Sequence, residues 1–284
     1  MRRILDERGA LVFPGVYDTL SAKIAERAGF PLAFISGYAV SATFIGQPDL
    51  GLLTQTEIVE RARQICGAVD IPILVDADTG YGNALNVVRT VRALVDAGAA
   101  GCFLEDQVWP KRCGHMEGKQ VVDRETWLQK IQAAVDTRGG RDFFIVARTD
   151  ALAAVGMDEA LARAEAAREA GADATFVEAP RSLDELREIG RRAPRPTVAN
   201  MVEQGRTPVL GRSELAGLGF DLILYPVAGL YASAQALTGV YRHLHDTGAT
   251  RGADDRPMAF EEFNELIGVD ESRALAARFE EPPG

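Results

Sequence analysis

Residues 71–105 read IPILVDADTGYGNALNVVRTVRALVDAGAAGCFLE, a pattern that predicts a strand, a helix and a second strand. The runs Ile71–Val75 and Gly101–Glu105 are short and mostly apolar, which is typical of parallel strands buried on both faces. Between them, residues 83–97 carry apolar side chains at helical spacing and stop at Gly98. A right-handed crossover of this kind lays the two strands side by side. The stretch therefore predicts one unit of a parallel α/β fold.

The same alternation recurs along the chain. Eight strand-then-helix units within about 250 residues favour a (β/α)8 TIM barrel over a doubly wound sheet, which usually has fewer strands. The other strand candidates are Leu11–Val16, Leu32–Ser36, Phe143–Ala147, Ala174–Glu178, Pro196–Ala199 and Leu222–Tyr225. The helix candidates are Asp18–Ala28, Glu57–Val69, Asn83–Ala97, Asp158–Ala170 and Leu183–Arg192.

The C-terminal part of the chain departs from this alternation. We assign residues 1–245 to a catalytic barrel domain and residues 246–284 to a linker with helices. The linker is Thr247–Pro257, and the helical pieces are Phe260–Ile267 and Glu271–Phe279. Their apolar content indicates a helical extension that docks on a neighbouring subunit.

Composition restricts the partners. The formal net charge is 31 − 41 = −10, so the surface repels nucleic acid and anionic membranes. A small anionic substrate would need local cations. Cys66, Cys102 and Cys113 fit no disulfide or zinc pattern, which indicates reduced thiols and a cytoplasmic location. Neither a signal peptide nor a membrane-spanning run is predicted.

In a barrel the active site lies at the C-terminal ends of the strands. Packing does not account for polar groups at five successive strand ends, so we interpret them as an active site. These five ends, from the third strand to the seventh, carry Asp76 and Asp78, then Glu105 and Asp106, then Arg148 and Asp150, then Glu178, and finally Asn200. The second strand is likewise followed by polar residues, Ser36, Gly37 and Tyr38.

Three acidic residues at these ends predict a metal site. Asp76 and Asp78 are two apart in an extended segment, so their side chains share one side and repel each other without a cation. Glu105 ends the next strand and joins them directly or through water. Such oxygen ligands suit Mg²⁺, with Mn²⁺ as an alternative ion. The competing interpretation is a solvated loop with helix-capping acids.

Two cations are candidate anion clamps. Arg148 directly follows an apolar strand, and Lys111 lies in a long polar loop. An arginine at such a position can hold a carboxylate through two parallel hydrogen bonds. A structural ion pair of Arg148 with Glu178 or Asp150 is the alternative, and the two interpretations are compatible.

The loop at residues 107–122 reads QVWPKRCGHMEGKQVV and is too polar for a core. Long ordered loops of this kind are usually lids or binding loops. Lys111, Arg112 and His115 flank Cys113, and a cationic neighbourhood lowers a thiol pKa and makes the thiol reactive or a usable acid. Cys66 and Cys102 are interpreted instead as small buried hydrophobes.

These motifs together resemble the isocitrate lyase/phosphoenolpyruvate mutase superfamily over about residues 10–280. Within it, residues 34–42 and 105–110 look most like the petal death protein and the 2,3-dimethylmalate lyases, whereas Phe34 and the loop after His115 depart from methylisocitrate lyases. The matching segments are KRCGHMEGK (111–119), DADTGYG (76–82), EDQ (105–107), ARTD (147–150), VEA (177–179) and ANM (199–201).

The resemblance implies a Mg²⁺-dependent lyase that splits a 2-hydroxy dicarboxylate into a 2-oxo acid and a second carboxylate. Cys113 would protonate the departing carbon once the loop closes. The family also implies a homotetramer, a dimer of dimers with an exchanged C-terminal helix. The implied catalytic residues are Cys113, Lys111, His115, Arg148 and Glu178; the substrate-binding residues are Ser36, Gly37, Tyr38, Asp49, Gly114 and Asn200; the metal ligands are Asp76, Asp78 and Glu105.

Two other functions stay open. One keeps the enolate chemistry but acts as a phosphonomutase of the carboxyphosphonoenolpyruvate or phosphoenolpyruvate type, or as an oxaloacetate hydrolase or decarboxylase. The other is a non-catalytic barrel, which predicts a broken site. The presence of Asp78, Lys111, Cys113 and Arg148 argues against the second.

Overall fold

The structure is a computed structural model that describes residues 1–252 and 257–279. Residues 253–256 of the predicted linker lie outside the described residues. The chain forms two compact units, Met1–Leu230 and Tyr231–Gly284. The site described below lies wholly in the first unit.

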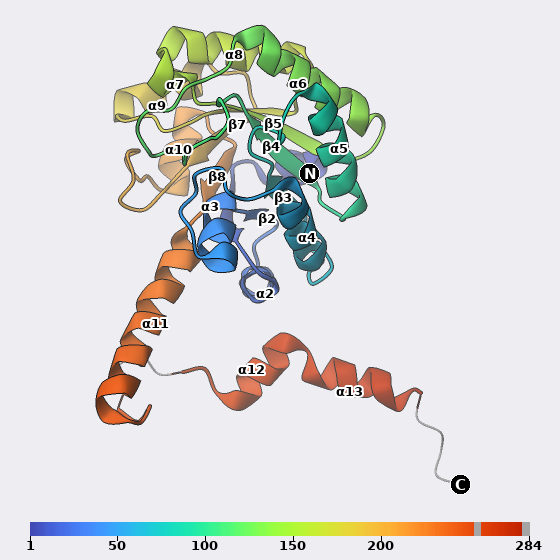
Figure 1. The fold of residues 1–284 in the computed structure, drawn as a ribbon, viewed down its shortest axis with the longest axis vertical. Coiled ribbons are helices and arrows are strands. Elements are labelled where there is room, and N and C mark those ends of the chain that lie inside the picture. Colours follow the sequence, from blue (N-terminus) through green and yellow to red (C-terminus); the bar gives the residue numbers. More distant parts are fainter. Residues whose placement is uncertain (253–256, 280–284) are drawn as a thin grey trace. The chain divides into compact units, whose positions relative to one another are not determined.

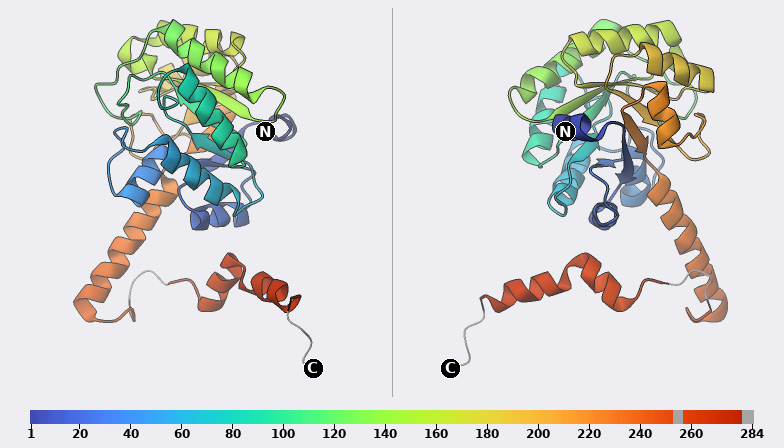
Figure 2. Two further views of the ribbon diagram at one scale, coloured as in Figure 1. Left: turned by 45° about the vertical axis from the view of Figure 1, so that its right-hand side comes forward. Right: turned by 180° about the vertical axis from the view of Figure 1, so that it is seen from behind.

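Eight parallel strands close into a barrel in sequence order, with β8 paired to β1, so the predicted (β/α)8 fold is confirmed. Helices surround the strands (Figures 1 and 2). Three strands have the predicted bounds and the others differ by one or two residues at their ends. The strands are β1 Leu11–Val16, β2 Ala33–Ile35, β3 Ile73–Asp76, β4 Gly101–Glu105, β5 Phe144–Thr149, β6 Ala174–Val177, β7 Thr197–Asn200 and β8 Leu222–Tyr225.

Helix starts follow local capping chemistry. Asp18, Thr54 and Asn83 each form a reciprocal capping box at the beginning of a helix. The short α3 and the π-helix η1 were not predicted, because nine residues give too little periodicity. The helices are α1 Arg2–Arg8, α2 Thr19–Arg27, α3 Gly37–Val40, η1 Ser41–Ile45, α4 Gln55–Cys66, α5 Ala84–Asp96, α6 Arg124–Arg138, α7 Ala151–Ala154, α8 Met157–Glu169, α9 Leu183–Arg192, α10 Arg212–Leu218, α11 Ala228–Thr247, α12 Phe260–Ile267 and α13 Val269–Ala277.

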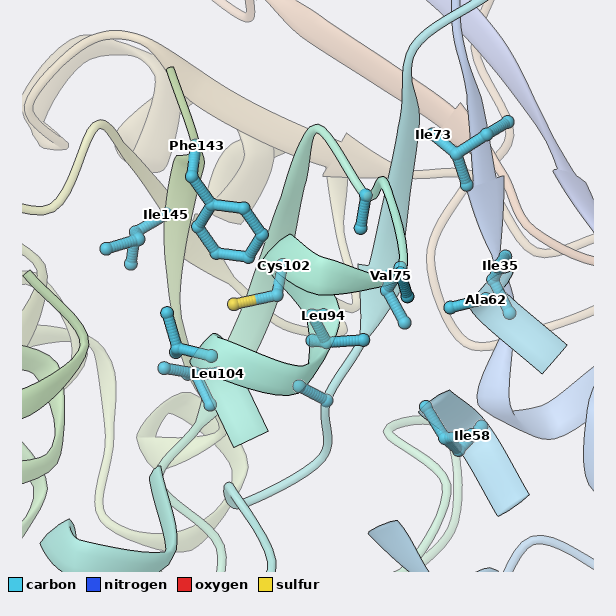
Figure 3. Packing of buried hydrophobic residues seen from close by; sticks show 14 of the residues in the cluster. Ile35, Ile58, Ala62, Ile73, Val75, Leu94, Cys102, Leu104, Phe143 and Ile145 are labelled. Carbon is cyan, nitrogen blue, oxygen red and sulfur yellow. The ribbon is translucent and has the colours of Figure 1, made fainter. Parts of the chain in front are cut away.

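Two layers of apolar side chains hold the barrel together. One cluster takes residues from all eight strands and therefore fills the barrel interior; Phe103 stands among them, with its ring 4.6 Å from that of Phe34 and 5.8 Å from that of Phe176. The other layer lies between strands and helices and consists of two clusters, one of which includes Cys102 and Leu104 (Figure 3). Successive residues of β4 thus face opposite sides, as the period of a strand requires.

Two further sequence predictions concern the cysteines and the C-terminal helices. All three cysteines are free, and Cys102 is buried in the core as predicted. No helix among the described residues is long and apolar enough to cross a membrane. In the second unit, large apolar side chains are exposed on α12 and α13 and beside them, among them Phe260, Phe263, Ile267, Leu275 and Phe279.

Candidate active site

The alternation along each strand places the polar residues at the barrel mouth. A residue two positions after an interior residue faces the same side, so the last inward side chain of each strand points into the mouth. The six pairs of interior residue and mouth residue are Phe34 and Ser36, Leu74 and Asp76, Phe103 and Glu105, Val146 and Arg148, Phe176 and Glu178, and Val198 and Asn200.

An acidic cluster lies on the β2–β4 side of the mouth. The Lys111 ammonium lies 2.6 Å from Asp49 Oδ1 and 2.7 Å from Asp78 Oδ1, and all three side chains are buried. Asp76 Oδ2 accepts the backbone N–H of Gly37 at 3.3 Å. Burial raises the pKa of Asp78 to about 7, since the Lys111 ammonium only partly offsets desolvation and the charges of Asp76 and Asp49. Lys111 therefore neutralises carboxylates here, instead of standing free as the predicted anion clamp.

Glu105 extends the acidic cluster toward Arg148. Its Oε2 lies 3.3 Å from Arg148 Nη2, and its buried Oε1 has no hydrogen-bond partner among the described residues. Burial raises the pKa of Glu105 well above its usual value, against the attraction of Arg148 and Lys111. Within residues 1–252 and 257–279, no three His, Cys, Asp or Glu side chains are already arranged to hold a metal ion. The Lys111 ammonium stands among the predicted metal ligands and their neighbour Asp49.

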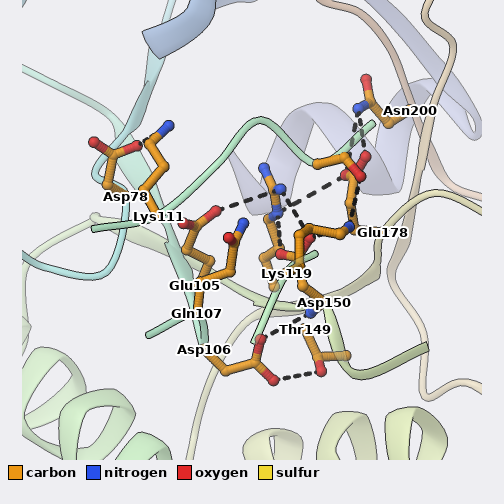
Figure 4. A network of polar contacts seen from close by, with 12 residues as sticks. Asp78, Glu105, Asp106, Gln107, Lys111, Lys119, Thr149, Asp150, Glu178 and Asn200 are labelled. Atoms are coloured by element: carbon orange, nitrogen blue, oxygen red, sulfur yellow. Dashed lines mark hydrogen bonds and ion pairs between the residues drawn. The ribbon is translucent and has the colours of Figure 1, made fainter. Parts of the chain in front are cut away.

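Arg148 contacts the carboxylates of the opposite side of the mouth, where Asp150 and Glu178 lie near each other (Figure 4). Its guanidinium donates to both Asp150 oxygens, at 2.9 and 3.2 Å, and lies 3.8 Å from Glu178 Oε2. The structural ion pair with Asp150 that was the alternative for Arg148 is therefore present. Asn200 Nδ2 donates to both Glu178 oxygens at 3.3 Å, which leaves Asn200 Oδ1 buried without a partner among the described residues.

The 107–122 loop folds over this side of the mouth. A β-carbon added at Gly114 would lie 2.6 Å from Arg148 Nη2 and 2.6 Å from the Glu178 carboxyl carbon. Only a glycine allows the loop backbone to approach these two side chains so closely. The Cys113 amide donates to the Asp49 carbonyl at 3.2 Å, so the loop contacts both sides of the mouth.

The thiol of Cys113 differs from the prediction. Its neighbours in sequence do not direct their charges to it: Lys111 binds carboxylates and Arg112 donates to the Glu117 carbonyl. Burial instead raises the pKa of Cys113 to about 11, which outweighs a backbone hydrogen bond from His115. At neutral pH the thiol is protonated, a state suited to an acid and not to a nucleophile.

The contacts of His115 also differ from those expected of a positively charged side chain. Its Nδ1 accepts the backbone N–H of Arg206 at 3.1 Å, and its Nε2 lies 3.1 Å from Glu178 Oε1. An acceptor at Nδ1 means that the ring is neutral with its proton on Nε2. The buried Nε2 lies close to Glu178 but makes no hydrogen bond among the described residues, so His115 differs from the free cation that the sequence suggested.

Sequence reasoning missed a buried network beneath the mouth. Asp106 accepts from Thr149 Oγ1 at 2.5 Å, from the Asp150 amide at 2.8 Å and from Arg163 at 3.0 Å. Lys119 donates to Asp150 Oδ1 at 2.6 Å. Lys119 and Asp106 both lie inside the motifs quoted above, but their partners are 31 and 43 residues away.

The three predicted residues that follow β2 have different environments, and only Tyr38 among them lines a separate cavity. Ser36 caps α3 by accepting the Ala39 amide, and Tyr38 lines a cavity of about 240 Å³ together with Asp49. The predicted substrate-binding residues therefore divide between two walls. Ser36, Gly37, Tyr38 and Asp49 stand on one wall, while Gly114 and Asn200 stand on the other.

A closed parallel barrel with carboxylates, a buried arginine and a covering loop at its C-terminal mouth has the architecture of a barrel enzyme. The chain belongs to the phosphoenolpyruvate phosphomutase family, which matches residues 1–245. The superfamily predicted from the loop and strand-end motifs is thereby confirmed.

Three relatives illustrate the range of the family. The chain is 52% identical over 281 residues to the chloroplastic carboxyvinyl-carboxyphosphonate phosphorylmutase of Arabidopsis thaliana, covering 98% of this chain and 83% of that protein. It is 48% identical to the petal death protein of Dianthus caryophyllus (98% and 88% covered) and 47% identical to the 2,3-dimethylmalate lyase of Eubacterium barkeri (97% and 95% covered).

Solved structures agree. A crystal structure of 2,3-dimethylmalate lyase superposes with a TM-score of 0.91 at 38% identity, covering 98% of this chain and 93% of that one. A structure of oxaloacetate acetylhydrolase bound to 3,3-difluorooxalacetate also gives 0.91, at 35% identity with 97% and 94% covered.

Proposed function

We propose that the protein is a Mg²⁺-dependent carbon–carbon lyase that cleaves a 2-hydroxy dicarboxylate, of the 2-alkyl- or 2,3-dialkylmalate or methylisocitrate type, into a 2-oxo acid such as pyruvate and a second carboxylate. The observation that carries this proposal is the approach of Gly114 to Arg148 and Glu178, which sets the protonated Cys113 beside the barrel mouth. The relatives named as 2,3-dimethylmalate lyase support the same class.

The acidic cluster fits a divalent cation. Burial, together with neighbouring carboxylates, raises the pKa of Asp78 and of Glu105, and Glu105 Oε1 has no hydrogen-bond partner among the described residues. Hard carboxylate oxygens in this state suit Mg²⁺, with Mn²⁺ as an alternative. Asp76, Asp78 and Glu105 would hold the ion, which supplies charge stabilisation for the oxygens of the 2-oxo acid. In this proposal Lys111 gives up part of its contact with Asp78 to the ion.

The residues of the chain supply the rest of the chemistry. In the proposed step a carboxylate at the mouth accepts the 2-hydroxyl proton, C2 becomes a carbonyl carbon, and the bond between C2 and C3 breaks with its electron pair left on C3. The buried Arg148 guanidinium and the Lys111 ammonium offset the negative charge that develops. Cys113 Sγ then gives its proton to C3, while Ser36, Gly37 and Tyr38 orient one carboxylate.

The other wall of the site would hold the second carboxylate. Asn200 donates to Glu178, His115 Nε2 lies 3.1 Å from the same carboxylate, and Gly114 packs against Glu178 with no space for a β-carbon. Closure of the 107–122 loop excludes water from the carbanion. Water would otherwise compete with Cys113 as the proton source and remove control of stereochemistry.

A phosphonomutase is the second candidate, because the phosphorylmutase of Arabidopsis thaliana is 52% identical to this chain. An oxaloacetate hydrolase or decarboxylase is the third, since a structure of oxaloacetate acetylhydrolase superposes at a TM-score of 0.91. A non-catalytic barrel would be expected to lack some of the predicted site residues. The predicted side chains are all present at the barrel mouth, which argues against that alternative.

The deciding experiment is pyruvate release, coupled to a dehydrogenase, from 2,3-dimethylmalate, 2-methylisocitrate and citramalate with Mg²⁺ or EDTA. Isocitrate is followed by glyoxylate release and oxaloacetate by oxalate release. We expect metal-dependent pyruvate release from one malate derivative. Release of oxalate alone would favour the hydrolase. Silence across the panel, with Mg²⁺ still bound, would favour the phosphonomutase.

We also propose that the apolar faces of α12 and α13 dock on a second copy within a homotetramer, a dimer of dimers. The exposed Phe260, Phe263 and Leu275 support this, because a monomer rarely leaves such a run in water. Light scattering of the full chain carrying Phe263→Glu tests it: a tetramer that survives unchanged would contradict the docking. A cytoplasmic location stays a prediction for cell fractionation.

A further inference from the structure

Arg206, on the loop between β7 and α10, contacts the 107–122 loop at three points. Its backbone N–H donates to His115 Nδ1 at 3.1 Å, its Nε donates to the His115 carbonyl at 2.8 Å, and its Nη2 lies 2.8 Å from Glu117 Oε1. One residue thus meets the ring, the backbone and the following acidic side chain of the covering loop. The two loops come from opposite halves of the sequence, 91 residues apart.

The contact with the ring has a chemical consequence. Because Nδ1 accepts a backbone N–H, the proton of the neutral ring resides on Nε2, which lies 3.1 Å from Glu178 Oε1 without meeting hydrogen-bond geometry. A ring of the other tautomer would set a lone pair against that carboxylate. The Arg206 backbone therefore decides which hydrogen-bonding face His115 presents to the mouth.

The turn that carries Arg206 is shaped for this approach. Gln204 has a φ of 57°, a conformation that few non-glycine residues adopt. A β-carbon added at Gly205 would lie 2.8 Å from His115 Nδ1, so a larger residue would push the ring away. Strained backbone of this kind persists where the surroundings demand it, often at a functional site.

The three contacts differ in strength. The Glu117 side chain is 85% exposed, so its ion pair with Arg206 contributes little. The partly buried bond from Nε to the His115 carbonyl and the backbone bond to Nδ1 carry most of the attachment. The side chain of Arg206 therefore fixes the loop, and its backbone fixes the ring.

We propose that Arg206 is a positioning residue: its side chain latches the 107–122 loop over the barrel mouth, and its backbone holds His115 with Nε2–H toward Glu178. The functional meaning of the latch rests on the proposed lyase activity, but the latch itself exists in the free protein. In the Arg206→Ala variant the loop opens more often, while His115 keeps its tautomer when the loop is closed. In the Gly205→Ala variant the tautomer is lost as well.

Hydrogen exchange of the substrate-free protein tests the latch. The amide of Cys113 is the probe, because it donates to the Asp49 carbonyl outside the loop, whereas the Met116 amide bonds to Cys113 within the loop and serves as an internal reference. We expect about tenfold faster exchange in Arg206→Ala, the change that corresponds to one ordinary net hydrogen bond. Arg206→Lys, which can keep one of the two side-chain contacts, should lie between. Arg191→Ala on the exposed end of α9 is the matched control. Equal exchange in Arg206→Ala and Arg191→Ala would overturn the latch.

Two readouts separate positioning from mere stability. Nitrogen chemical shifts of His115 should report an Nε2-protonated ring in the parent and in Arg206→Ala, but not in Gly205→Ala. A parent ring protonated on Nδ1 would overturn the assignment of the backbone contact. With an active substrate, Arg206→Ala should lower kcat at least as much as it raises KM, since closure precedes proton delivery. Faster exchange without any lyase activity would leave the latch standing and refute only the proposed function.

Discussion

The Lys119 ammonium lies 2.6 Å from Asp150 Oδ1, and both side chains are buried. The same ammonium donates to the Gly114 carbonyl at 2.5 Å. Asp150 also receives the Arg148 guanidinium, and these two cations outweigh burial and hold the pKa of Asp150 at about 2. The covering loop is thus tied to the residue that follows β5, next to the arginine of the mouth.

Removal of Lys119 should be costly. In Lys119→Met the buried Asp150 loses one of its two cations, and breaking a buried pair from one side costs about 3–5 kcal/mol of unfolding free energy. Urea denaturation measures the loss. Arg187→Ala, which breaks an exposed pair with Asp184, serves as control and should cost under about 1 kcal/mol. Equal losses in the two variants would show that Lys119 is not structural.

The pH dependence of Cys113 alkylation follows from its raised pKa. Only the thiolate reacts, so a pKa of about 11 makes the thiol slow toward iodoacetamide at pH 7–8 and faster as the pH rises toward 11. Peptide mass spectrometry separates Cys113 from Cys66, whose pKa burial also raises to about 11. A rate that levels off below pH 9 would restore the low-pKa interpretation that the flanking cations suggested.

Replacement of the thiol by a hydroxyl tests its role as acid. Cys113→Ser should keep substrate binding within a few-fold and lower kcat by about 10²–10⁴, the usual contribution of a positioned acid. Calorimetric binding and single-turnover kinetics report the two effects separately. Cys66→Ser, on the outer end of α4, controls for the loss of a thiol. Near-normal turnover in Cys113→Ser would remove Cys113 from the mechanism.

Gly114→Ala tests the close approach of the loop. The added β-carbon would collide with Arg148 and Glu178, so the loop must shift by the order of 1 Å, which costs about 10²-fold in turnover. Gly140→Ala is the matched control, because a β-carbon there meets nothing within 4 Å. Turnover in Gly114→Ala equal to that of the control would mean that the loop does not close on these side chains during the reaction.

Metal binding has a readout that needs no substrate. Mg²⁺ at a hundred times its Kd should add about 2.7 kcal/mol of stability and raise the Tm accordingly. Asp78→Asn should abolish this rise, whereas Asp184→Asn on exposed α9 should retain it. A Tm rise that persists in Asp78→Asn would place the ion elsewhere.

The barrel and most of its mouth followed from sequence because both depend on short-range order. Apolar runs mark the strands, and the period of two carries each interior residue to a mouth residue, as from Phe103 to Glu105. The contacts of the 107–122 loop could not be predicted from the sequence. Lys111 was expected to face the substrate but pairs with Asp49 and Asp78, because the path of a long loop depends on partners far along the chain.

Dependence on partners that are distant in sequence also explains why the contacts of Arg206 and Asp106 were not predicted. Nothing near Arg206 in sequence indicates that His115 lies above it, since the two residues meet only after the barrel has closed. Asp106 follows Glu105 and faces the opposite side of β4, where Thr149 and Arg163 reach it. Its place could have been predicted from the strand period, but its partners could not.

The pairing of β4 with β5 sets Glu105 opposite Arg148 in the hydrogen-bonded ladder. The distance between this carboxylate and this guanidinium is therefore set by the backbone of the two strands, and it does not depend on a loop. A designer who grafts new loops onto this barrel keeps that charge pair as a fixed reference point. New loops would then change the residues around the mouth, while the Glu105–Arg148 pair stays with the barrel.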